Sequence, residues 1–280
     1  MSLTFRKAQR SKARLRLGLC GPAGSGKTWS ALTLATGIGG RIALIDTENH
    51  SGELYANQFD YDILTIEAPF TPEKYVAAIK AAEEAGFNTI ITDSLSHAWS
   101  GEGGLLDIQG KIADKERNSY TAWRQVTPRH NLLIESMLQS KCHIIATMRS
   151  KVEYVLTEET SKSGNKVMVP KKVGMAPVQR EGMDYEFTVV LDIDSDHDAK
   201  ASKDRTSIFL DPLPFRITVE TGKKLADWLN EGKEAPKVEA PKPTCGNCRK
   251  KDLKTDATET RDGLDLCGPC SARYDELNKK

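Results

Sequence analysis

A glycine-rich segment near the start of the chain constrains the fold more than any other feature. Residues 21–28, GPAGSGKT, follow an apolar stretch at residues 15–20 and precede a helical pattern at residues 27–36. A strand that enters a helix through such a turn predicts an α/β fold in which backbone N–H groups of the turn face a phosphate. The candidate phosphate-binding residues are Gly21, Pro22, Ala23, Gly24, Ser25, Gly26, Lys27 and Thr28. We expect Lys27 to bridge the β- and γ-phosphates of ATP and Thr28 to hold Mg²⁺.

Strand-like and helical patterns alternate along the first half of the chain. Buried strands are expected at residues 15–20, 41–45, 63–66, 88–92 and 143–147, and helices at residues 27–36, 72–85 and 105–117 and from Pro128 onwards, with Thr127 as the N-cap. This alternation predicts a mainly parallel sheet with helices on both faces.

Beyond residue 150 the chain has short β-rich runs in place of this alternation. Residues 152–156 and 166–169 flank a Ser/Gly/Asn segment, a pattern typical of a hairpin or a mobile loop. Residues 187–192 and 206–210 are expected to be strands joined by an acidic turn, which we interpret as an exposed hairpin and not as a metal site. Residues 225–229 are expected to belong to a closing helix.

A carboxylate follows the apolar strand at residues 88–92. Asp93 occupies the position at which P-loop proteins bind Mg²⁺ with an acidic side chain. We therefore expect Lys27, Thr28 and Asp93 to act together on a magnesium-bound nucleotide. Hydrolysis requires one more group, which polarises the attacking water.

Two further segments resemble RecA recombinases. The run IDTENH at residues 45–50 resembles the segment that ends the second strand of these proteins with a catalytic glutamate. The resemblance assigns that role to Glu48 and leaves Asp46 a structural one. The run HIIATMR at residues 143–149 resembles the strand that senses the γ-phosphate, and the resemblance gives that role to Thr147, although RecA itself usually has an amide there.

Over residues 14–215 the chain looks like the AAA-type P-loop ATPases that tailed bacteriophages encode. Some of these are shortened RecA relatives that act in single-strand annealing and recombination. Residues 171–187 and 202–205 carry much of this likeness beyond the strand motifs. The resemblance implies a RecA-like core, ATP and Mg²⁺ as ligands, a homo-oligomer, and single-stranded DNA as a partner. It also implies a single-strand-binding protein or another replication partner.

In RecA relatives the loop after the sensor strand faces DNA, and the matching segment here is residues 150–180. Its candidate DNA contacts are Lys162, Lys166, Lys171 and Lys172, which would bind phosphates without reading sequence. An ordinary solvated hairpin accounts for the same residues equally well. Candidate cations for a neighbouring subunit's site are Lys171, Lys172, Lys203 and Arg205.

Four of the six cysteines fall near the C-terminus as two CxxC pairs. Cys245, Cys248, Cys267 and Cys270 have the spacing of a zinc ribbon, in which four thiolates form a closed shell around Zn²⁺. The other two, Cys20 and Cys142, are expected to be inert core thiols. We divide the chain into a basic arm at residues 1–14, a P-loop ATPase domain at 15–230, a linker at 231–243 and a zinc-ribbon module at 244–280.

Composition narrows the hypotheses. The net charge is +1, so a nucleic-acid-binding surface must be local, and no apolar run is long enough to span a membrane. We expect a cytoplasmic location, in the host cell if a phage encodes the chain. The leading hypothesis is an ATPase that acts on single-stranded DNA in phage recombination or replication. The alternative is a nucleotide-controlled adaptor, or a helicase-loader-like factor, that recruits a partner through the zinc ribbon.

Overall fold

The computed structural model describes residues 5, 7–160, 166–211, 213–233, 259–261 and 264–266, with the backbone alone at 152–175, 259–261 and 264–266. The chain divides into two compact units, Met1–Lys233 and Glu234–Lys280. The second unit contains the antiparallel strands β9 (Glu259–Arg261) and β10 (Leu264–Leu266). Lys162 and the predicted zinc ligands Cys245, Cys248, Cys267 and Cys270 lie outside the described residues.

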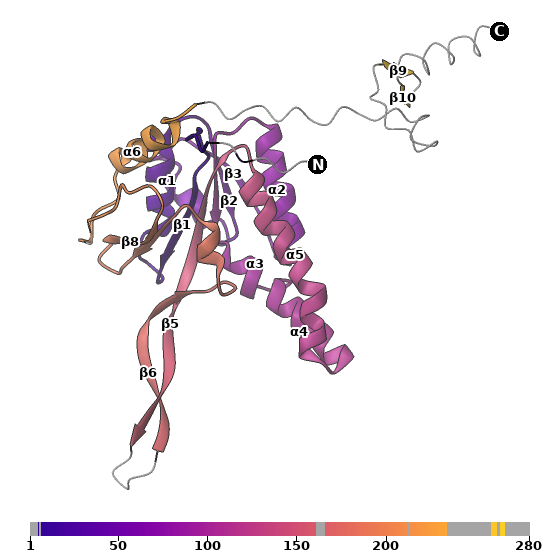
Figure 1. Cartoon of the computed structure of the whole chain (residues 1–280), viewed down its shortest axis with the longest axis vertical. Coiled ribbons are helices and arrows are strands. Elements are labelled where there is room, and N and C mark those ends of the chain that lie inside the picture. Colours follow the sequence, from indigo (N-terminus) through magenta and orange to yellow (C-terminus); the bar gives the residue numbers. More distant parts are fainter. Residues whose placement is uncertain are drawn as a thin grey trace, which may run out of the picture. The chain divides into compact units, whose positions relative to one another are not determined.

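The first unit is built around a sheet with the strand order β3–β2–β4–β5–β1–β7–β8 (Figure 1). The strands are β1 (Arg16–Gly21), β2 (Ile42–Asp46), β3 (Asp62–Thr65), β4 (Thr89–Asp93), β5 (His143–Thr160), β6 (Lys166–Pro177), β7 (Val189–Ile193) and β8 (Ala199–Asp204). Every pairing along this path is parallel except that of β7 with β8. The carboxyl ends of β1, β2, β4 and the sheet portion of β5 therefore meet at one edge of the sheet.

Helices cover both faces of the sheet (Figure 1), as the sequence predicts. α1 (Lys27–Ile38) and α6 (Val219–Asn230) pack on one face, and α2 (Pro72–Glu84) and α5 (Ser119–Gln139) pack on the other. Side chains alternate along each strand. Leu17 and Leu19 therefore pack in the apolar cluster on the face covered by α1 and α6, and Cys20 packs in the cluster on the face covered by α2 and α5. The other described helical elements are α3 (Ser96–Ser100), α4 (Leu105–Glu116), η1 (Ser51–Tyr55) and η2 (Met183–Glu186).

The prediction of a helix that starts at Pro128 with Thr127 as its N-cap is wrong. α5 begins at Ser119, and the side chain of Asn118 caps it by accepting hydrogen bonds from the N–H groups of Tyr120 and Thr121. Pro128 lies inside the helix. A proline costs about 3 kcal/mol at such a position, but Ala122 and Val126 are both fully buried and extend the apolar face of the helix towards its N-terminus. Burial of this face, in a helix that packs against α4, outweighs the local signal.

The strand predicted at residues 206–210 is also wrong, because the partner of β7 is β8. Asp204 ends β8 and turns the chain: its Oδ1 accepts the N–H of Thr206 at 2.6 Å, and its Oδ2 accepts the N–H of Phe209 at 2.8 Å. A strand cannot continue through a segment whose N–H groups are bound to one carboxylate. The polar composition of β8 hid it from the pattern of apolar residues.

Two long strands confirm the hairpin predicted between residues 152 and 169. β5 leaves the sheet and pairs antiparallel with β6 from Ser150 opposite Pro177 to Thr160 opposite Lys166. Both strands are longer than the sequence predicts. Across the described part of the chain, the helices are all too short or too polar to cross a membrane.

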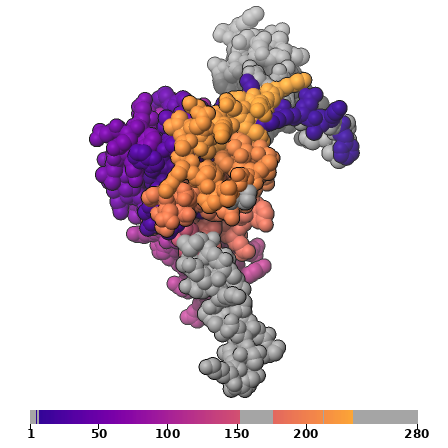
Figure 2. Space-filling view, turned by 90° about the vertical axis from the view of Figure 1, so that its left-hand side faces the viewer, coloured from indigo at the N-terminus to yellow at the C-terminus, as the bar shows by residue number. Residues whose placement is uncertain are grey.

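The N-terminal arm is fixed to the segment that follows α6, and the two lie side by side in the space-filling view (Figure 2). The N–H of Lys12 donates to the carbonyl of Lys233 at 2.9 Å. Arg10 donates to Glu231 at 2.8 Å and stacks over the ring of Trp228 at 4.2 Å. Arg14 lies 3.1 Å from Nε2 of His143, and burial lowers the pKa of His143 to about 4. Arg10 and Arg14 of the arm therefore both have partners within the same unit.

Candidate nucleotide-binding site

The glycine-rich segment forms the turn between β1 and α1. Gly24 and Gly26 have φ angles of 77° and 83°, a backbone conformation that side chains disfavour. A Cβ atom at Gly21 would lie 2.4 Å from Oγ of Ser25 and 2.5 Å from the carbonyl oxygen of Ile193, so this position admits glycine alone. Gly26 is the N-cap of α1 and has no side chain to bind the first N–H groups of the helix. Those groups and the helix dipole favour an anion at this point.

Lys27 lies over the turn that precedes it. Its Nζ donates to the carbonyl oxygens of Gly21 at 3.0 Å and Pro22 at 2.7 Å. Burial lowers the pKa of Lys27, while the nearby carboxylates of Asp93 and Glu48 oppose that shift. The ammonium group is thus held at the mouth of the loop by carbonyl oxygens, which a phosphate oxygen can replace as acceptor.

Asp93 receives two hydroxyl groups from separate elements. Oγ1 of Thr28, on α1, donates to its Oδ2 at 2.5 Å, and Oγ1 of Thr147, on β5, donates to its Oδ1. Asp93 is 3% exposed and Thr147 is fully buried. Burial raises the pKa of Asp93 despite the two hydroxyl donors. A buried carboxylate beside a threonine hydroxyl is a hard oxygen donor set that suits Mg²⁺, and a bound cation would supply the counter-charge that these hydroxyls lack.

The structure gives Thr147 a position different from that of an exposed phosphate sensor. β5 lies between β1 and β4, and the hydroxyl of Thr147 points across to the Asp93 carboxylate on β4. The role that the resemblance assigns to Thr147 stays a prediction. In the structure the hydroxyl of Thr147 contacts Asp93, the side chain expected to bind Mg²⁺.

Glu48 follows β2 in a loop that Asp46 fixes. Asp46 is fully buried; its Oδ1 accepts the N–H of Glu48 at 2.7 Å and its Oδ2 accepts the N–H of Gly52 at 3.2 Å. This geometry matches the structural role expected of Asp46. The carboxylate of Glu48 is thereby placed at the same edge of the sheet as Lys27 and Asp93.

Arg149 binds both carboxylate oxygens of Glu48, a contact that sequence reasoning missed. Nε donates to Oε1 at 3.0 Å, and Nη2 donates to Oε2. Burial alone would raise the pKa of Glu48, but hydrogen bonds from Arg149 and Ser94 outweigh it and the pKa is lowered. A signal was present: Arg149 stands two residues after Thr147, so both side chains leave the same face of a strand.

A cavity of about 410 Å³ opens beside this ion pair. Its lining includes Glu48, Phe70, His97 and Arg149. The ring of His97 stacks on Phe70, and its Nδ1 lies 2.8 Å from Oγ1 of Thr47. Burial lowers the pKa of His97, so the ring is held neutral at physiological pH. Glu48 therefore borders an open cavity, whereas Asp93 is buried.

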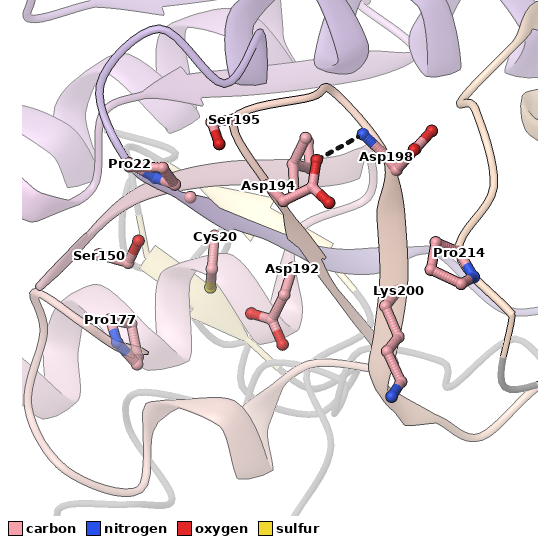
Figure 3. A pocket seen from close by; sticks show the side chains of 12 residues that line it. Cys20, Pro22, Ser150, Pro177, Asp192, Asp194, Ser195, Asp198, Lys200 and Pro214 are labelled. Atoms are coloured by element: carbon pink, nitrogen blue, oxygen red, sulfur yellow. Dashed lines mark hydrogen bonds between the residues drawn. The ribbon is translucent and has the colours of Figure 1, made fainter. Parts of the chain in front are cut away.

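A second cavity, of about 420 Å³, lies on the other side of the phosphate loop (Figure 3). Cys20 and Pro22 line it together with Asp192, Asp194 and Asp198 from β7 and the turn after it. Asp194 accepts the N–H of Asp198 at 2.9 Å, the dashed contact in Figure 3, which confirms the expected acidic hairpin turn. Burial raises the pKa of Cys20, in agreement with an inert thiol.

Several predicted site residues are not tested by these contacts. Lys166, Lys171 and Lys172 lie on β6, where the backbone alone is described. Among the described side chains, no three of His, Cys, Asp or Glu come close enough together to hold a metal ion. The predicted zinc cysteines fall outside that part of the chain.

A glycine-rich loop between β1 and α1, a lysine over it, and a threonine and a strand-terminal aspartate in contact define the class of protein. The chain is a P-loop nucleotide-binding protein of α/β fold. Comparison with protein-family models matches residues 13–217 to the AAA domain, and the chain belongs to this family. A search of curated proteins finds no match.

Proposed function

We propose that the protein binds ATP with Mg²⁺, hydrolyses it to ADP and phosphate, and acts on single-stranded DNA. The observation that carries the first part is the contact between Thr28 and Asp93 beneath the loop that Lys27 covers. Thr28 and Asp93 would hold Mg²⁺, which when bound neutralises phosphate charge and orients the oxygens of the nucleotide. Lys27 would exchange the carbonyls of Gly21 and Pro22 for β- and γ-phosphate oxygens.

Glu48 is the proposed general base. Its carboxylate accepts a proton from the water that attacks the γ-phosphorus, while the bond between that phosphorus and the bridging oxygen breaks and ADP leaves. The lowered pKa of Glu48 keeps it ionised at neutral pH, which this role requires. The charges of Asp93 and Glu48 both act on the pKa of Lys27, and the charge of Glu48 acts on the pKa of Asp93. This mutual influence supports a shared site.

The DNA part of the proposal rests on the connection between the phosphate loop and the hairpin. β5 carries Thr147 inside the sheet and, three residues later, begins the antiparallel pairing with β6 at Ser150. Nucleic acid on the hairpin and nucleotide at the sheet edge would thus contact one continuous strand. The resemblance to RecA relatives supports single-stranded DNA, in phage recombination or replication, as the polymer.

The test is the ATPase rate and the binding of an unstructured oligothymidylate across a salt series. Replacing Lys162 and Lys166 with alanine is expected to weaken binding and to flatten its salt dependence, because fewer counterions are released. Deletion of residues 1–9 is the control, since it removes Arg6 and Lys7 but keeps the contacts of Arg10 and Arg14. Full binding by the lysine variant and loss of binding by the deletion would refute the hairpin as the DNA site.

The division of the chain at Lys233 favours a second candidate function, that of a nucleotide-controlled adaptor. In this case Cys245, Cys248, Cys267 and Cys270 bind Zn²⁺, and the small unit recruits a partner, such as a single-strand-binding protein. The purified chain is expected to contain about one zinc, as a closed four-thiolate shell requires. Cys267→Ser should release it without changing the melting of the P-loop unit. Absence of oligothymidylate binding at low salt, with zinc present, would favour this function over the first.

A further inference from the structure

The ion pair between Glu48 and Arg149 joins the proposed general base to the strand that forms the hairpin. We propose that Arg149 is a positioning residue that withholds Glu48 from the attacking water, and that nucleic acid on the β5–β6 hairpin moves Arg149 and frees the carboxylate. The inference deepens the proposed function and rests on it. It assigns a role to Arg149, which belongs neither to the P-loop nor to the pair of carboxylates Glu48 and Asp93.

Each oxygen of Glu48 accepts one hydrogen bond from Arg149 in this arrangement. The guanidinium donates from Nε to Oε1 and from Nη2 to Oε2, the parallel geometry that matches a carboxylate best. A general base must accept a hydrogen bond from water at a free oxygen lone pair in line with the reacting phosphorus. The two-point contact also fixes the plane of the carboxylate. Glu48 can act efficiently once at least one of these bonds is exchanged for water.

Among the described residues, no cation other than Arg149 contacts the Glu48 carboxylate. His97, on α3, is held neutral by burial, and Lys27, on α1, donates to the loop carbonyls. The charge of Glu48 contributes to the raised pKa of Asp93, on β4, so these two carboxylates repel each other. Arg149 therefore fixes the orientation of Glu48 and, together with a hydrogen bond from Ser94, lowers its pKa.

The backbone of Arg149 stands at a junction of three elements. Its N–H donates to Oγ of Ser96, the first residue of α3, at 2.9 Å. Its carbonyl accepts the N–H of Val178, directly after β6, at 2.6 Å. The next residue, Ser150, forms the first pair of the hairpin with Pro177. A displacement of either hairpin strand thus reaches Arg149 without any intervening residue.

The ion pair is also placed where it can open. The side chain of Arg149 is 49% exposed and that of Glu48 is 24% exposed, and the cavity of about 410 Å³ lies beside them. Water can take over the hydrogen bonds of both partners when they separate. The buried contacts of Asp93 with Thr28 and Thr147 lack this freedom, so the mobile member of the site is the Glu48 side.

The experiment measures kcat and KM for ATP with and without oligothymidylate in Arg149→Ala, Arg149→Lys and Arg129→Ala. Arg149→Ala is expected to raise the DNA-free kcat about fivefold or more, the lower end of usual coupling between sites, with KM little changed. Stimulation by the oligonucleotide should fall towards none. Arg149→Lys keeps the charge but loses the two-point contact, so its DNA-free kcat should lie between those of Arg149→Ala and the wild type.

Arg129→Ala is the matched control. Arg129 forms an equally two-pointed pair with Glu73 at 2.6 Å, between α5 and α2 and away from the nucleotide site. Its removal should change neither rate. A melting curve for each variant establishes that the unit is folded. The pH profile adds a readout that a structural role would not move: without Arg149 the pKa of Glu48 rises, so the acid limb of kcat shifts to higher pH.

The outcomes separate this inference from the function beneath it. A fall of the DNA-free kcat in folded Arg149→Ala overturns the inference, because Arg149 would then assist the chemistry directly. Unchanged rates and undiminished DNA stimulation overturn it as well. If oligothymidylate has no effect on the wild type but Arg149→Ala still raises kcat, restraint of Glu48 holds and the DNA role fails. Absence of hydrolysis in both proteins overturns the inference and the proposed ATPase together.

Discussion

The candidate site has two halves that hold a carboxylate in opposite ways. In the closed half, Asp93 is 3% exposed and meets the hydroxyls of Thr28 and Thr147. In the open half, the Glu48 side chain is 24% exposed and meets the guanidinium of Arg149. Burial raises the pKa of the first carboxyl, whereas the arginine holds the pKa of the second below its ordinary value.

The difference indicates a division of labour. A buried carboxylate with hydroxyl partners alone is costly in its charged form, so a cation bound there gains the charge interaction that the fold leaves open. A half-exposed ion pair contributes about 0–1 kcal/mol and can be exchanged readily. The closed half is therefore suited to permanent ligand binding, and the open half is suited to a change during the reaction cycle.

The largest expected effect is in the closed half, from Lys27→Ala. Loss of the ammonium removes the β- and γ-phosphate contact, and we expect ATPase activity to fall by about a thousandfold, as when a main charge-stabilising donor is lost. The fold should persist, because Lys27 contacts the carbonyls of its own loop. Lys111→Ala, on the surface of α4, is the control. Near-normal turnover in folded Lys27→Ala would contradict the site.

In the open half, Glu48→Gln should retain ATP binding and reduce turnover by about a hundredfold or more, within the usual range for loss of a general base. Glutamine still fills the position but cannot accept the proton. Glu53→Gln, in η1 and paired with His50, serves as the control. Equal turnover by Glu48→Gln and the wild type would move the role to another group.

Thr147→Val tests how much the hydrogen bond from Thr147 to Asp93 contributes to the stability of the closed half. The change keeps the shape and removes a hydroxyl donor from a buried carboxylate, which should lower the free energy of unfolding by about 1–3 kcal/mol. Thr36→Val removes a hydroxyl that contacts only a carbonyl within its own helix and should cost less. Denaturant unfolding without nucleotide compares the two. An equal loss in both variants would show that the Asp93 contact adds little.

The smallest expected effect, and the sharpest contrast between the halves, is a gain in stability from Asp93→Asn. The raised pKa of Asp93 means that the folded state binds a proton more tightly than the unfolded chain. Stability from this group is present at low pH and is lost as the pH rises through the folded-state pKa. A neutral side chain should raise Tm at neutral pH by about 2–4 °C, or about 1 kcal/mol in a domain of this size.

The measurement is a melting curve without Mg²⁺ or nucleotide, in which Asp93→Asn should also lack part of the wild-type pH dependence. Magnesium-dependent nucleotide binding should be lost in the same variant. Asp62→Asn, whose carboxylate pairs with Arg41 on the surface, is the control. A decrease in Tm for Asp93→Asn at neutral pH would show that the charged form of Asp93 is not a cost to the fold.

Local signals in the sequence predicted the phosphate loop and the strands that carry Asp46 and Asp93. They failed where a signal was outweighed or hidden. Pro128 marked a helix start, but the helix begins earlier and continues through it, because Ala122 and Val126 are buried. The polar strand β8 lacked an apolar pattern, and its end depends on the bonds that the Asp204 carboxylate makes with later N–H groups.

By itself, the sequence determined the glycine-rich turn between strand and helix at residues 21–28, because turn geometry and strand periodicity depend on neighbouring residues. It also gave Lys27, Thr28, Glu48 and Asp93 as candidates for nucleotide chemistry. The tertiary structure alone decided that β5 lies between β1 and β4, which brings Thr147 to Asp93. It also brought together Glu48 and Arg149, which are 101 residues apart. The order of strands in a sheet is set by packing of both faces and by the connections between strands, and no local pattern records it.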